Sequence, residues 1–468
     1  MKNTLLSAAL LLGVSAASAQ SYQGFLTDNY SGVHGLISNP ANITDSRFKT
    51  DVNLAGVSTF FGNDYYGVSL SDITSGDFDF DIDGATTPTA DNKIFGNADI
   101  LGPAFMFNIK PNHSLALFTR ARVNYNITEI DGRTFESVAD GFDENESFFV
   151  EEGDFYMTAQ GWSEIGLTYA AILMDRNEHF VKGGISLKYL QGLGNVYSSG
   201  SNVTIDYDPN GSTLPNGETV PSITSAGEVS YGKSDNIEED FELEQVSGAS
   251  GFGTDLGFVY EWRPDFASYT TTDEDGNTTV PKGQNKYKLK LGLSITDLGS
   301  VKYDDAEESS YDITNSVTEA DFESEDGLED KLNNLYRLTA TNSSTKAVLP
   351  TALHLNADYN LAKRFYLNLN TDISMSSSSK ANVGRIANTL ALTPRFESKW
   401  FSFYMPLGTV QGSGFQWGAG LRAGPLYIGS GSILTTLMSD NVQAADIYAG
   451  LKIPIYQGKG RKLSGNTL

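Results

Sequence analysis

The chain has 468 residues, of which 58 are Asp or Glu and 32 are Lys or Arg, giving a formal charge of -26. It contains no cysteine, which excludes disulfides, cysteine-ligated zinc and an acylated N-terminal cysteine, and its acidity argues against nucleic-acid binding. Because 40% of the residues are hydrophobic and 11% are aromatic, the composition is too apolar for a disordered acidic chain.

The N-terminus has the order of features found in secretory signal peptides. Lys2 precedes an apolar stretch from Leu5 to Val14, and Ala17-Ser18-Ala19 forms a small-residue cleavage site. We therefore predict a signal peptide in residues 1–19. Its apolar stretch is too short to span a bilayer, and no later segment reaches 18 consecutive apolar residues, so we expect no transmembrane helix in the mature chain.

Residues 20–48 are too irregular for a lipid-facing strand and contain the motif Asn39-Pro40-Ala41. Pro40 disfavours helix at Asn39 and removes a backbone donor, so it ends any helix over residues 28–37. We predict that this segment lies inside the lumen of the barrel that the strands after residue 48 are expected to form. The alternative is an ordinary periplasmic linker with a turn.

Residues 49–456 show strict alternation of apolar and polar side chains, which is typical of strands with one apolar face. Between Phe365 and Ile373, for example, Phe365, Leu367, Leu369 and Ile373 share one face. Counting these segments predicts fourteen strands. A soluble sandwich also alternates, so the connections between strands have to decide between the two folds.

The predicted connections alternate between short and long almost throughout. Short turns such as Pro111-Asn112-His113 contrast with long segments such as 197–250 and 303–348, and four long segments hold 37 of the 58 acidic residues. Short turns at one end and long loops at the other are typical of a transmembrane β-barrel, which closes because every backbone amide needs a partner in lipid. The fold class predicted is therefore all-β, an antiparallel transmembrane barrel of about 14 strands.

The end of the chain supports this interpretation. Ile447, Ala449, Leu451, Ile453 and Ile455 form a final alternating strand that ends at Tyr456 and resembles the C-terminal assembly signal of bacterial outer-membrane proteins. Residues 457–468 are expected to be a short periplasmic tail.

The Asn-Pro-Ala element between a signal peptide and a first strand resembles the N-terminal hatch of FadL-type outer-membrane transporters. The resemblance implies a fourteen-stranded barrel in the outer membrane of a Gram-negative bacterium that carries hydrophobic compounds. The acidic loops and the segment 292–299 also resemble uncharacterised barrels of the Bacteroidota, some of which accompany gliding and secretion machinery.

If the apolar face points to lipid, the lumen carries more cations than acids. An anionic head group is one ligand for such a lining; the alternative is that the cations pair with carboxylates of the wall and the hatch. The candidate ligand-binding residues are Arg120, Arg122, Lys188, Lys288, Lys290, Arg395 and Arg422, and the candidate hatch residues are Asn39, Pro40 and Ala41.

The remaining motifs give weaker indications of a functional site. Asp79, Asp81 and Asp83 match the first half of a calcium loop, but Ala90 stands where the bidentate Glu is expected, and an amphipathic strand explains the spacing as well. No serine-elbow, zinc-protease or phosphate-loop motif occurs, so we expect no catalytic site, no metal and no cofactor, although His354 lies on an inward face. Trp162, Trp262, Trp400 and Trp417 are interpreted as aromatics of the membrane interface.

The function predicted is passive transport of hydrophobic or amphiphilic small molecules. The alternatives are a non-transporting barrel that serves as an adaptor or surface component of a secretion or gliding assembly, and an outer-membrane hydrolase. The expected partners are outer-membrane lipids and lipopolysaccharide, the barrel assembly machinery and a hydrophobic small molecule, with no nucleic acid.

Overall fold

The computed structural model describes residues 22–69, 85–140, 146–237, 244–269, 271–272, 278–279, 282–325, 327–377 and 380–457. The predicted signal peptide, the Asp79-Asp81-Asp83 motif and all but the first residue of the predicted tail lie outside these ranges.

The strands form a closed antiparallel barrel of 14 strands, which confirms the predicted fold class. The barrel closes where β1 pairs with β4 on one side and with β25 on the other. The wall consists, in order, of β1 (Phe48–Asn63), β4 (Asn92–Lys110), β5 (His113–Ile130), β6 (Phe148–Arg176), β7 (His179–Thr213), β9 (Ala249–Trp262), β12 (Leu289–Tyr303), β17 (Ala352–Ala362), β18 (Phe365–Ser374), β19 (Thr389–Glu397), the interrupted strands β20 (Phe401–Tyr404) with β21 (Leu407–Val410) and β22 (Gly414–Trp417) with β23 (Ala419–Ala423), β24 (Leu426–Ser430) and β25 (Ala444–Tyr456).

The alternating pattern turns apolar side chains outward. On β9, Leu256 and Phe258 are exposed on the outer face, whereas Asp255 before them and Val259 after them are buried. An outer surface of this kind suits contact with hydrocarbon, and charged side chains of β9 such as Asp255 and Glu261 lie on the buried inner face. Trp162 departs from its predicted place: it is 1% exposed on the inner face, because it lies two positions before the inward Glu164 on β6.

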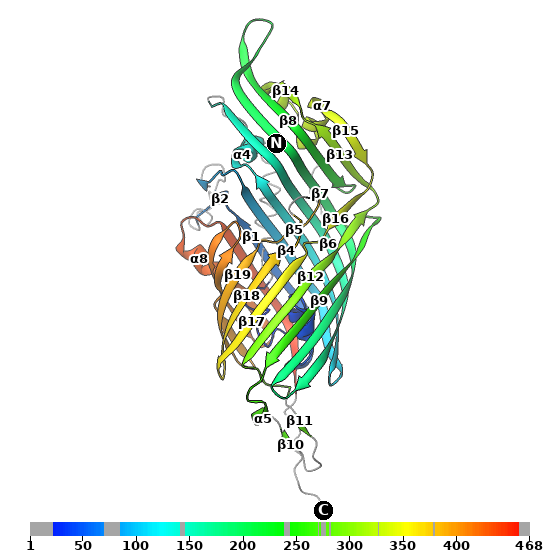
Figure 1. Cartoon of the computed structure of the whole chain (residues 1–468), viewed down its shortest axis with the longest axis vertical. Helices are drawn as coiled ribbons and strands as arrows, with labels where there is room; N and C mark the ends of the chain where they lie inside the picture. Colours follow the sequence, from blue (N-terminus) through cyan, green and yellow to red (C-terminus); the bar gives the residue numbers. More distant parts are fainter. Residues whose placement is uncertain are drawn as a thin grey trace, which may run out of the picture.

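One side of the barrel wall extends far beyond the other (Figure 1). Within residues 197–250 and 303–348, which the sequence predicts as loops, strands continue the sheet instead, because β7 runs on for 35 residues and pairs with β8 (Thr219–Ser234). We call this extension the outer sheet. Its other members are β13 (Ala306–Asp312), β14 (Asn315–Thr318), β15 (Arg337–Asn342) and β16 (Thr345–Val348), with helices α6 (Glu319–Glu323) and α7 (Gly327–Leu335) between strands.

The remaining elements are short. Helix α4 (Gly132–Asp140) follows β5, and β2 (Tyr66–Gly67) pairs with β3 (Ala85–Thr86). Helix α5 (Phe266–Tyr269) and the pair β10 (Thr271–Thr272) and β11 (Thr278–Thr279) lie at the opposite end from the outer sheet (Figure 1). In the described part of the chain, no helix is both long and apolar enough to cross a bilayer.

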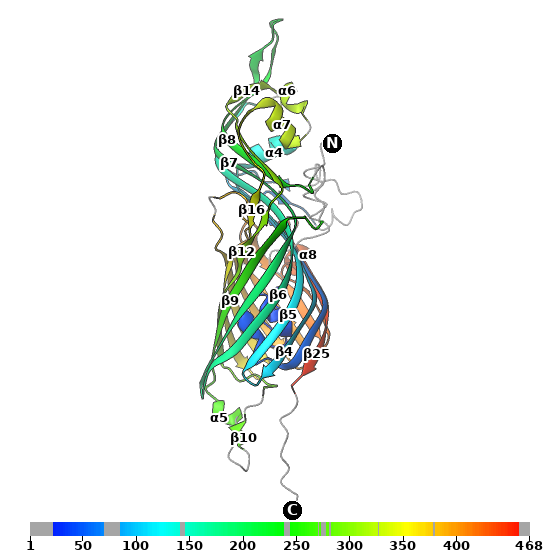
Figure 2. The same ribbon diagram turned by 90° about the vertical axis from the view of Figure 1, so that its right-hand side faces the viewer.

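Residues 22–47, which we call the luminal segment, lie inside the barrel (Figure 2). The segment folds into two short 3-10 helices, η1 (Gly32–Leu36) and η2 (Pro40–Ile43). Val33, Leu36 and Ile43 pack with wall residues such as Phe48 and Phe118 in one apolar cluster. The segment is therefore held partly by hydrophobic contact with the inner wall.

The ladder between β1 and β25 is incomplete. Their pairing runs from Phe48–Tyr456 to Ala55–Leu451, and beyond that point β1 continues to Asn63 paired with β4. On the other side, β25 pairs with β24 only as far as Gly429–Tyr448. Helix α8 (Ile433–Met438) lies at this part of the wall and is joined to β22 by a hydrogen bond from Trp417 N to Thr435 Oγ1 (2.7 Å). We call this stretch the wall gap.

Candidate functional site

The Asn-Pro-Ala motif docks the luminal segment against three neighbouring strands. Asn39 Nδ2 donates to the carbonyl oxygens of Phe258 on β9 (3.1 Å) and Leu293 on β12 (3.3 Å). Its Oδ1 accepts from Ala41 N (2.9 Å), so the same side chain caps η2, which starts at Pro40. One amide thus satisfies backbone groups of the segment and of the wall.

Glycines of the wall make room for the motif. A methyl group at Gly257 of β9 would lie 2.2 Å from Asn39 Oδ1, and one at Gly184 of β7 would lie 2.5 Å from the carbonyl carbon of Pro40. Gly184 and Gly257 are directly paired in the ladder. The close approach of segment and wall therefore depends on missing side chains at this position.

Asp45, near the end of the luminal segment, is surrounded by cations of the wall. Its carboxylate contacts Arg263 Nη2 (2.9 Å) and Lys286 Nζ (3.2 Å), and Arg263 also binds Glu261 at 2.6 Å. Burial opposes ionisation of Asp45, but Lys286, Arg47 and Arg263 outweigh it, and the pKa of this carboxyl is lowered. The segment is consequently anchored by a buried charge network, not by apolar contact alone.

The start of the segment is held in a second network. Asp28 Oδ2 accepts from Arg422 Nε at 3.0 Å, and Asn29 Nδ2 donates to Glu397 Oε2 at 2.9 Å. Glu397 pairs with Arg395, whose Nη2 also contacts Asp358 at 2.8 Å. The charged members are all buried, so loss of one of them leaves a buried charge with one partner fewer.

A third network lies wholly between wall strands. Asp297 accepts from Arg122 (2.7 Å) and Lys188 (2.6 Å), and Lys188 also contacts Asp255 (2.7 Å). Glu164 lies 3.5 to 3.8 Å from three cations, and Arg120 pairs with Asp99. The network spans β4, β5, β6, β7, β9 and β12, and so ties six neighbouring strands together across the lumen.

An aromatic cluster encloses His34 on η1. Phe25 stacks on Tyr427 with ring centroids 4.2 Å apart, and Tyr22, Tyr404 and Tyr448 pack around them. Burial and the nearby Lys452 lower the pKa of His34 well below its ordinary value. Its Nε2 lies 2.7 Å from the hydroxyl of Tyr427.

The predicted ligand-binding cations fall into three groups. Arg120, Arg122 and Lys188 share the network around Asp297, and Lys290 and Arg395 share Asp358. Arg422 binds Asp28 of the luminal segment. Lys288 lies apart, with its Nζ 2.7 Å from the carbonyl oxygen of Asn360 and 4.7 Å from the centre of the Tyr359 ring.

Several carboxylates of these networks were not identified from the sequence. Glu397 lies two residues after Arg395 on the same strand, so the alternation that placed Arg395 inward also places Glu397 there. Asp297 has a backbone φ of 60° at an irregularity in β12, where the period of two is broken, and no alternation pattern could have found it. The further inward acids not identified are Asp28, Asp45, Asp51 and Asp99.

His354 takes part in a short polar chain. Its Nδ1 lies 2.5 Å from Asp372 Oδ1, and its Nε2 lies 2.8 Å from Thr296 Oγ1. A carboxylate, an imidazole and a hydroxyl in this order also occur in hydrolases. Thr296 is only 4% exposed, however, so its hydroxyl is not open to a substrate in this conformation.

The wall gap adjoins the luminal segment. A small cavity there is lined by Gln23 of the segment, Phe60 of β1 and Asp446 of β25, together with Val410, Gln416, Gly431 and Ser432. Asp446 accepts hydrogen bonds from Gly431 N (2.6 Å) and Ser432 Oγ (2.6 Å), which close the gap above the end of β24. Side chains and a helix, in place of a ladder, therefore seal this stretch.

Solved barrels share the general fold at low similarity. The superposition on the toluene transporter TbuX of Ralstonia pickettii covers 92% of this chain and 95% of the transporter chain, with 8% identity and a TM-score of 0.40. The superposition on the toluene transporter TodX of Pseudomonas putida covers 93% of this chain and 94% of the transporter chain, with 9% identity and a TM-score of 0.29. The superposition on the outer membrane phospholipase A of Escherichia coli covers 87% of this chain and 98% of the phospholipase chain, with 8% identity and a TM-score of 0.25. Transporters and an enzyme match alike, so no function follows from them.

A comparison with family models gives a more specific result. None of the curated proteins matches the sequence. A model for a family of unknown function, DUF5723, matches residues 40–431, which is more than half of the chain. The chain therefore belongs to the DUF5723 family, whose function is unknown.

Proposed function

We propose that this protein is an outer-membrane barrel of a Gram-negative bacterium that passively transports hydrophobic or amphiphilic small molecules, which leave the lumen through the wall gap. The observation that supports this proposal is the end of strand pairing between β1 and β25 at Ala55–Leu451. A continuous ladder has no room for a solute, and opening one inside lipid leaves backbone groups unpaired. Between the Ala55–Leu451 pair and the bond from Asn63 N to Gln443 O (2.9 Å), no strand pairing joins β1 to β25 in the part of the chain that the structure describes, so a solute there displaces chiefly side-chain contacts.

The surroundings of the gap suit an apolar solute. On the outside, Leu437 and Met438 of α8 are 60% and 75% exposed, which offers apolar surface towards the membrane. On the inside, Gln23 of the luminal segment lines the same small cavity. The segment and α8 would therefore act together as the barrier, since both must shift before a molecule passes.

A reversible cross-link tests this route. The chain contains no cysteine, so the double variant Gln23→Cys/Gly431→Cys can be joined by a short cleavable thiol cross-linker that reacts nowhere else. We expect uptake of a fluorescent long-chain fatty acid or an uncharged aromatic probe into proteoliposomes to stop after cross-linking and to return after reduction. The control pair Ser309→Cys/Thr341→Cys lies on paired residues of the outer sheet and should have no effect. Uptake that continues with the gap cross-linked contradicts the route.

The predicted luminal cations remain candidates for holding an anionic head group, except Lys288, which lies against the exposed ring of Tyr359 on the outer face. Six of the seven already have a carboxylate within 4 Å, so a ligand would bind by replacing a protein carboxylate. We expect Arg120→Gln/Arg122→Gln to weaken binding of an anionic amphiphile and to leave a neutral one unaffected. Heat-dependent gel mobility would check that the variant is folded, and unchanged binding in a folded barrel contradicts this role.

The second candidate is a non-transporting barrel that serves as an adaptor or surface component of a secretion or gliding assembly. It is favoured by the filling of the interior, where Tyr22, Phe25, Val33 and Ala41 of the luminal segment are 0% exposed. If the protein is of this kind, the wild type transports no probe in either state of the cross-link, and deletion of residues 22–47 opens a conductance that the intact barrel lacks.

A further inference from the structure

A row of polar side chains marks the outer border of the apolar band on β7, β9, β12 and β16. Ser250 is paired with Gln191 on one side and with Lys302 on the other, and Lys302 is paired with Lys346. One step closer to the membrane, Phe252 is paired with Tyr189 and Ser300. The change from apolar to polar thus occurs at the same register on neighbouring strands.

The position of this row agrees with the thickness of a membrane. From Trp262 to Phe252, the outward side chains of β9 are aromatic or aliphatic except for Thr254, over a length of about 33 Å at 3.3 Å per residue. With a strand tilt of about 40°, this length rises about 25 Å, the usual height of the apolar band of such barrels. Lys302 and Lys346 therefore lie at the level of the lipid head groups on the side of the outer sheet.

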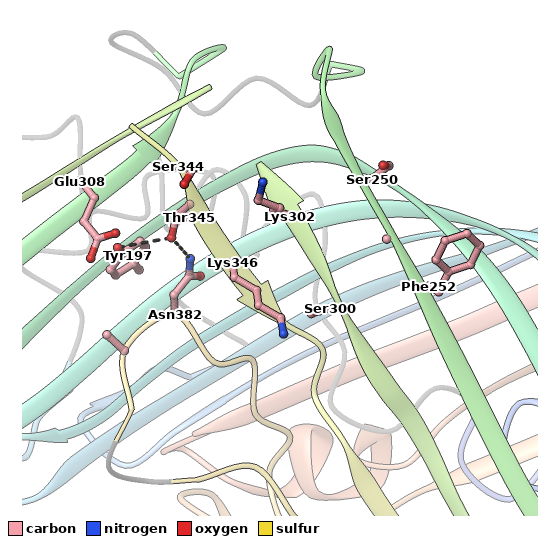
Figure 3. A pocket seen from close by; sticks show the side chains of 12 residues that line it. Tyr197, Ser250, Phe252, Ser300, Lys302, Glu308, Ser344, Thr345, Lys346 and Asn382 are labelled. Atoms are coloured by element: carbon pink, nitrogen blue, oxygen red, sulfur yellow. Dashed lines mark hydrogen bonds between the residues drawn. The ribbon is translucent and has the colours of Figure 1, made fainter. Parts of the chain in front are cut away.

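The two lysines are unusual in their arrangement. Like charges directly opposite each other in a sheet destabilise it, and the protein as a whole carries a charge of -26. Lys302 pairs with the exposed Asp304 at 2.5 Å, whereas Lys346 has no carboxylate partner among the described residues. In Figure 3 the two side chains extend in different directions, so an anion bound here would attract both ammonium groups towards itself.

An open cavity of about 650 Å³ lies over these residues (Figure 3). Lys302, Lys346 and Phe252 line it from three neighbouring strands, and Ser250, Ser300 and Ser344 add hydroxyl groups. Phe252 is 77% exposed and contacts the ring of Tyr189 edge to face, with centroids 5.8 Å apart. Glu308 lies at the other end of the cavity, beside Tyr197 (Figure 3).

We propose that this cavity binds the phosphorylated head group of a glycolipid of the outer leaflet, with the phosphate between Lys302 and Lys346 and the first part of an acyl chain against Phe252. Phosphate suits paired ammonium groups and hydroxyl donors, and an acyl chain suits an exposed phenyl ring at the edge of the apolar band. The proposal rests on the outer-membrane placement and does not depend on transport.

The test measures retention of lipid by the purified barrel. Wild type and Lys302→Gln/Lys346→Gln would be titrated in detergent with diphosphorylated lipid A and with its dephosphorylated form, and the bound lipid counted by native mass spectrometry. Two lysines near a charged lipid surface should strengthen binding about ten-fold or more. We therefore expect the variant to bind the phosphorylated lipid at least about ten-fold more weakly than the wild type, and the dephosphorylated lipid equally well. The control Lys110→Gln/Lys363→Gln removes the same charge at the opposite end of the wall and should bind as the wild type does.

Two further arms separate a lipid from a free anion. Phe252→Ala should weaken binding of lipid A and leave any binding of inorganic phosphate unchanged. Equal affinity of the wild type for inorganic phosphate and for lipid A would identify an ion site and overturn the proposal. Equal retention of phosphorylated lipid by the wild type and the lysine variant would also overturn it. If the lysine variant loses lipid binding but still takes up the transport probe normally, the lipid site is supported independently of the transport route.

Discussion

The interior of the barrel and the outer sheet use charge in opposite ways. Inside, Asp297 is 4% exposed and lies between Arg122 and Lys188, both of them buried. In the outer sheet, Arg337 and Asp312 also form an ion pair, but their side chains are 74% and 28% exposed. Removing one partner of a buried pair leaves a desolvated charge, whereas water replaces a lost surface partner. The charges that hold this fold together should therefore be the luminal ones.

The largest effect is expected from Asp297→Asn. Asparagine tolerates the positive φ of 60° at this position, so the change removes charge with little backbone strain. Arg122 and Lys188 then lose a shared partner, and we expect the free energy of unfolding to fall by about 3–5 kcal/mol. Urea unfolding of the refolded barrel in lipid, followed by tryptophan fluorescence, would measure this loss.

A control and a rescue sharpen that comparison. Asp304→Asn removes the exposed partner of Lys302 and should cost less than about 1 kcal/mol. Adding Arg122→Gln to Asp297→Asn removes the cation that has lost its nearest carboxylate, while Lys188 keeps Asp255, and should recover part of the stability. Similar losses for Asp297→Asn and Asp304→Asn would contradict the distinction between the interior and the outer sheet.

The next effect concerns the contact between the luminal segment and the wall. In Gly257→Ala, the new methyl group would lie 2.2 Å from Asn39 Oδ1, so the Asn-Pro-Ala motif has to move away. Overpacking of this kind costs about 1–3 kcal/mol. We expect the amides of residues 39–43 to exchange hydrogen faster while the wall strands stay protected.

Gly96→Ala on β4 is the matched control for this change. The nearest atom to its new methyl group would be 3.7 Å away, an ordinary contact, and the position has no positive φ. Exchange in residues 39–43 should remain as in the wild type. Unaltered exchange in Gly257→Ala would show that the segment does not depend on this glycine.

The sequence predicts the parts of the fold that follow a regular period. Alternation and turn asymmetry predict the fourteen strands, and the order of signal peptide, Asn-Pro-Ala motif and first strand predicts a segment in the lumen. The outer sheet escapes that reasoning. The acidic segment 197–250 is interpreted as a loop, yet it contains the pairing of β7 with β8, and β8 pairs in turn with β13 and β14, which are distant in sequence.

The candidate site is harder to predict for a related reason. A period of two places Arg122 and Lys188 inward, but it does not reveal that Asp297 reaches both of them, because a bulge interrupts β12 between Ile295 and Leu298. The partners of Asp28 and Asp45 depend on how an irregular segment folds inside the barrel. Pairing across a lumen is therefore a property of the closed structure and not of any one strand.

The smallest effect is expected in the outer sheet, at the pair of Asp312 and Arg337. Hydrogen bonds from Arg337 and Thr314 lower the pKa of Asp312 to about 2. Because this pKa is below the ordinary value, the stabilising contribution is complete above about pH 4 and is lost as the pH falls through about 2. In Arg337→Gln the pKa of Asp312 should rise towards its ordinary value, as measured by NMR titration of the carboxyl carbon, while the unfolding midpoint at neutral pH should hardly change.

Thr314→Val is a graded control: it removes a weaker hydrogen bond to Asp312 and should raise the pKa of Asp312 by less than Arg337→Gln does. If Arg337→Gln instead destabilised the barrel as strongly as Asp297→Asn, solvent exposure would not be what separates the two kinds of ion pair.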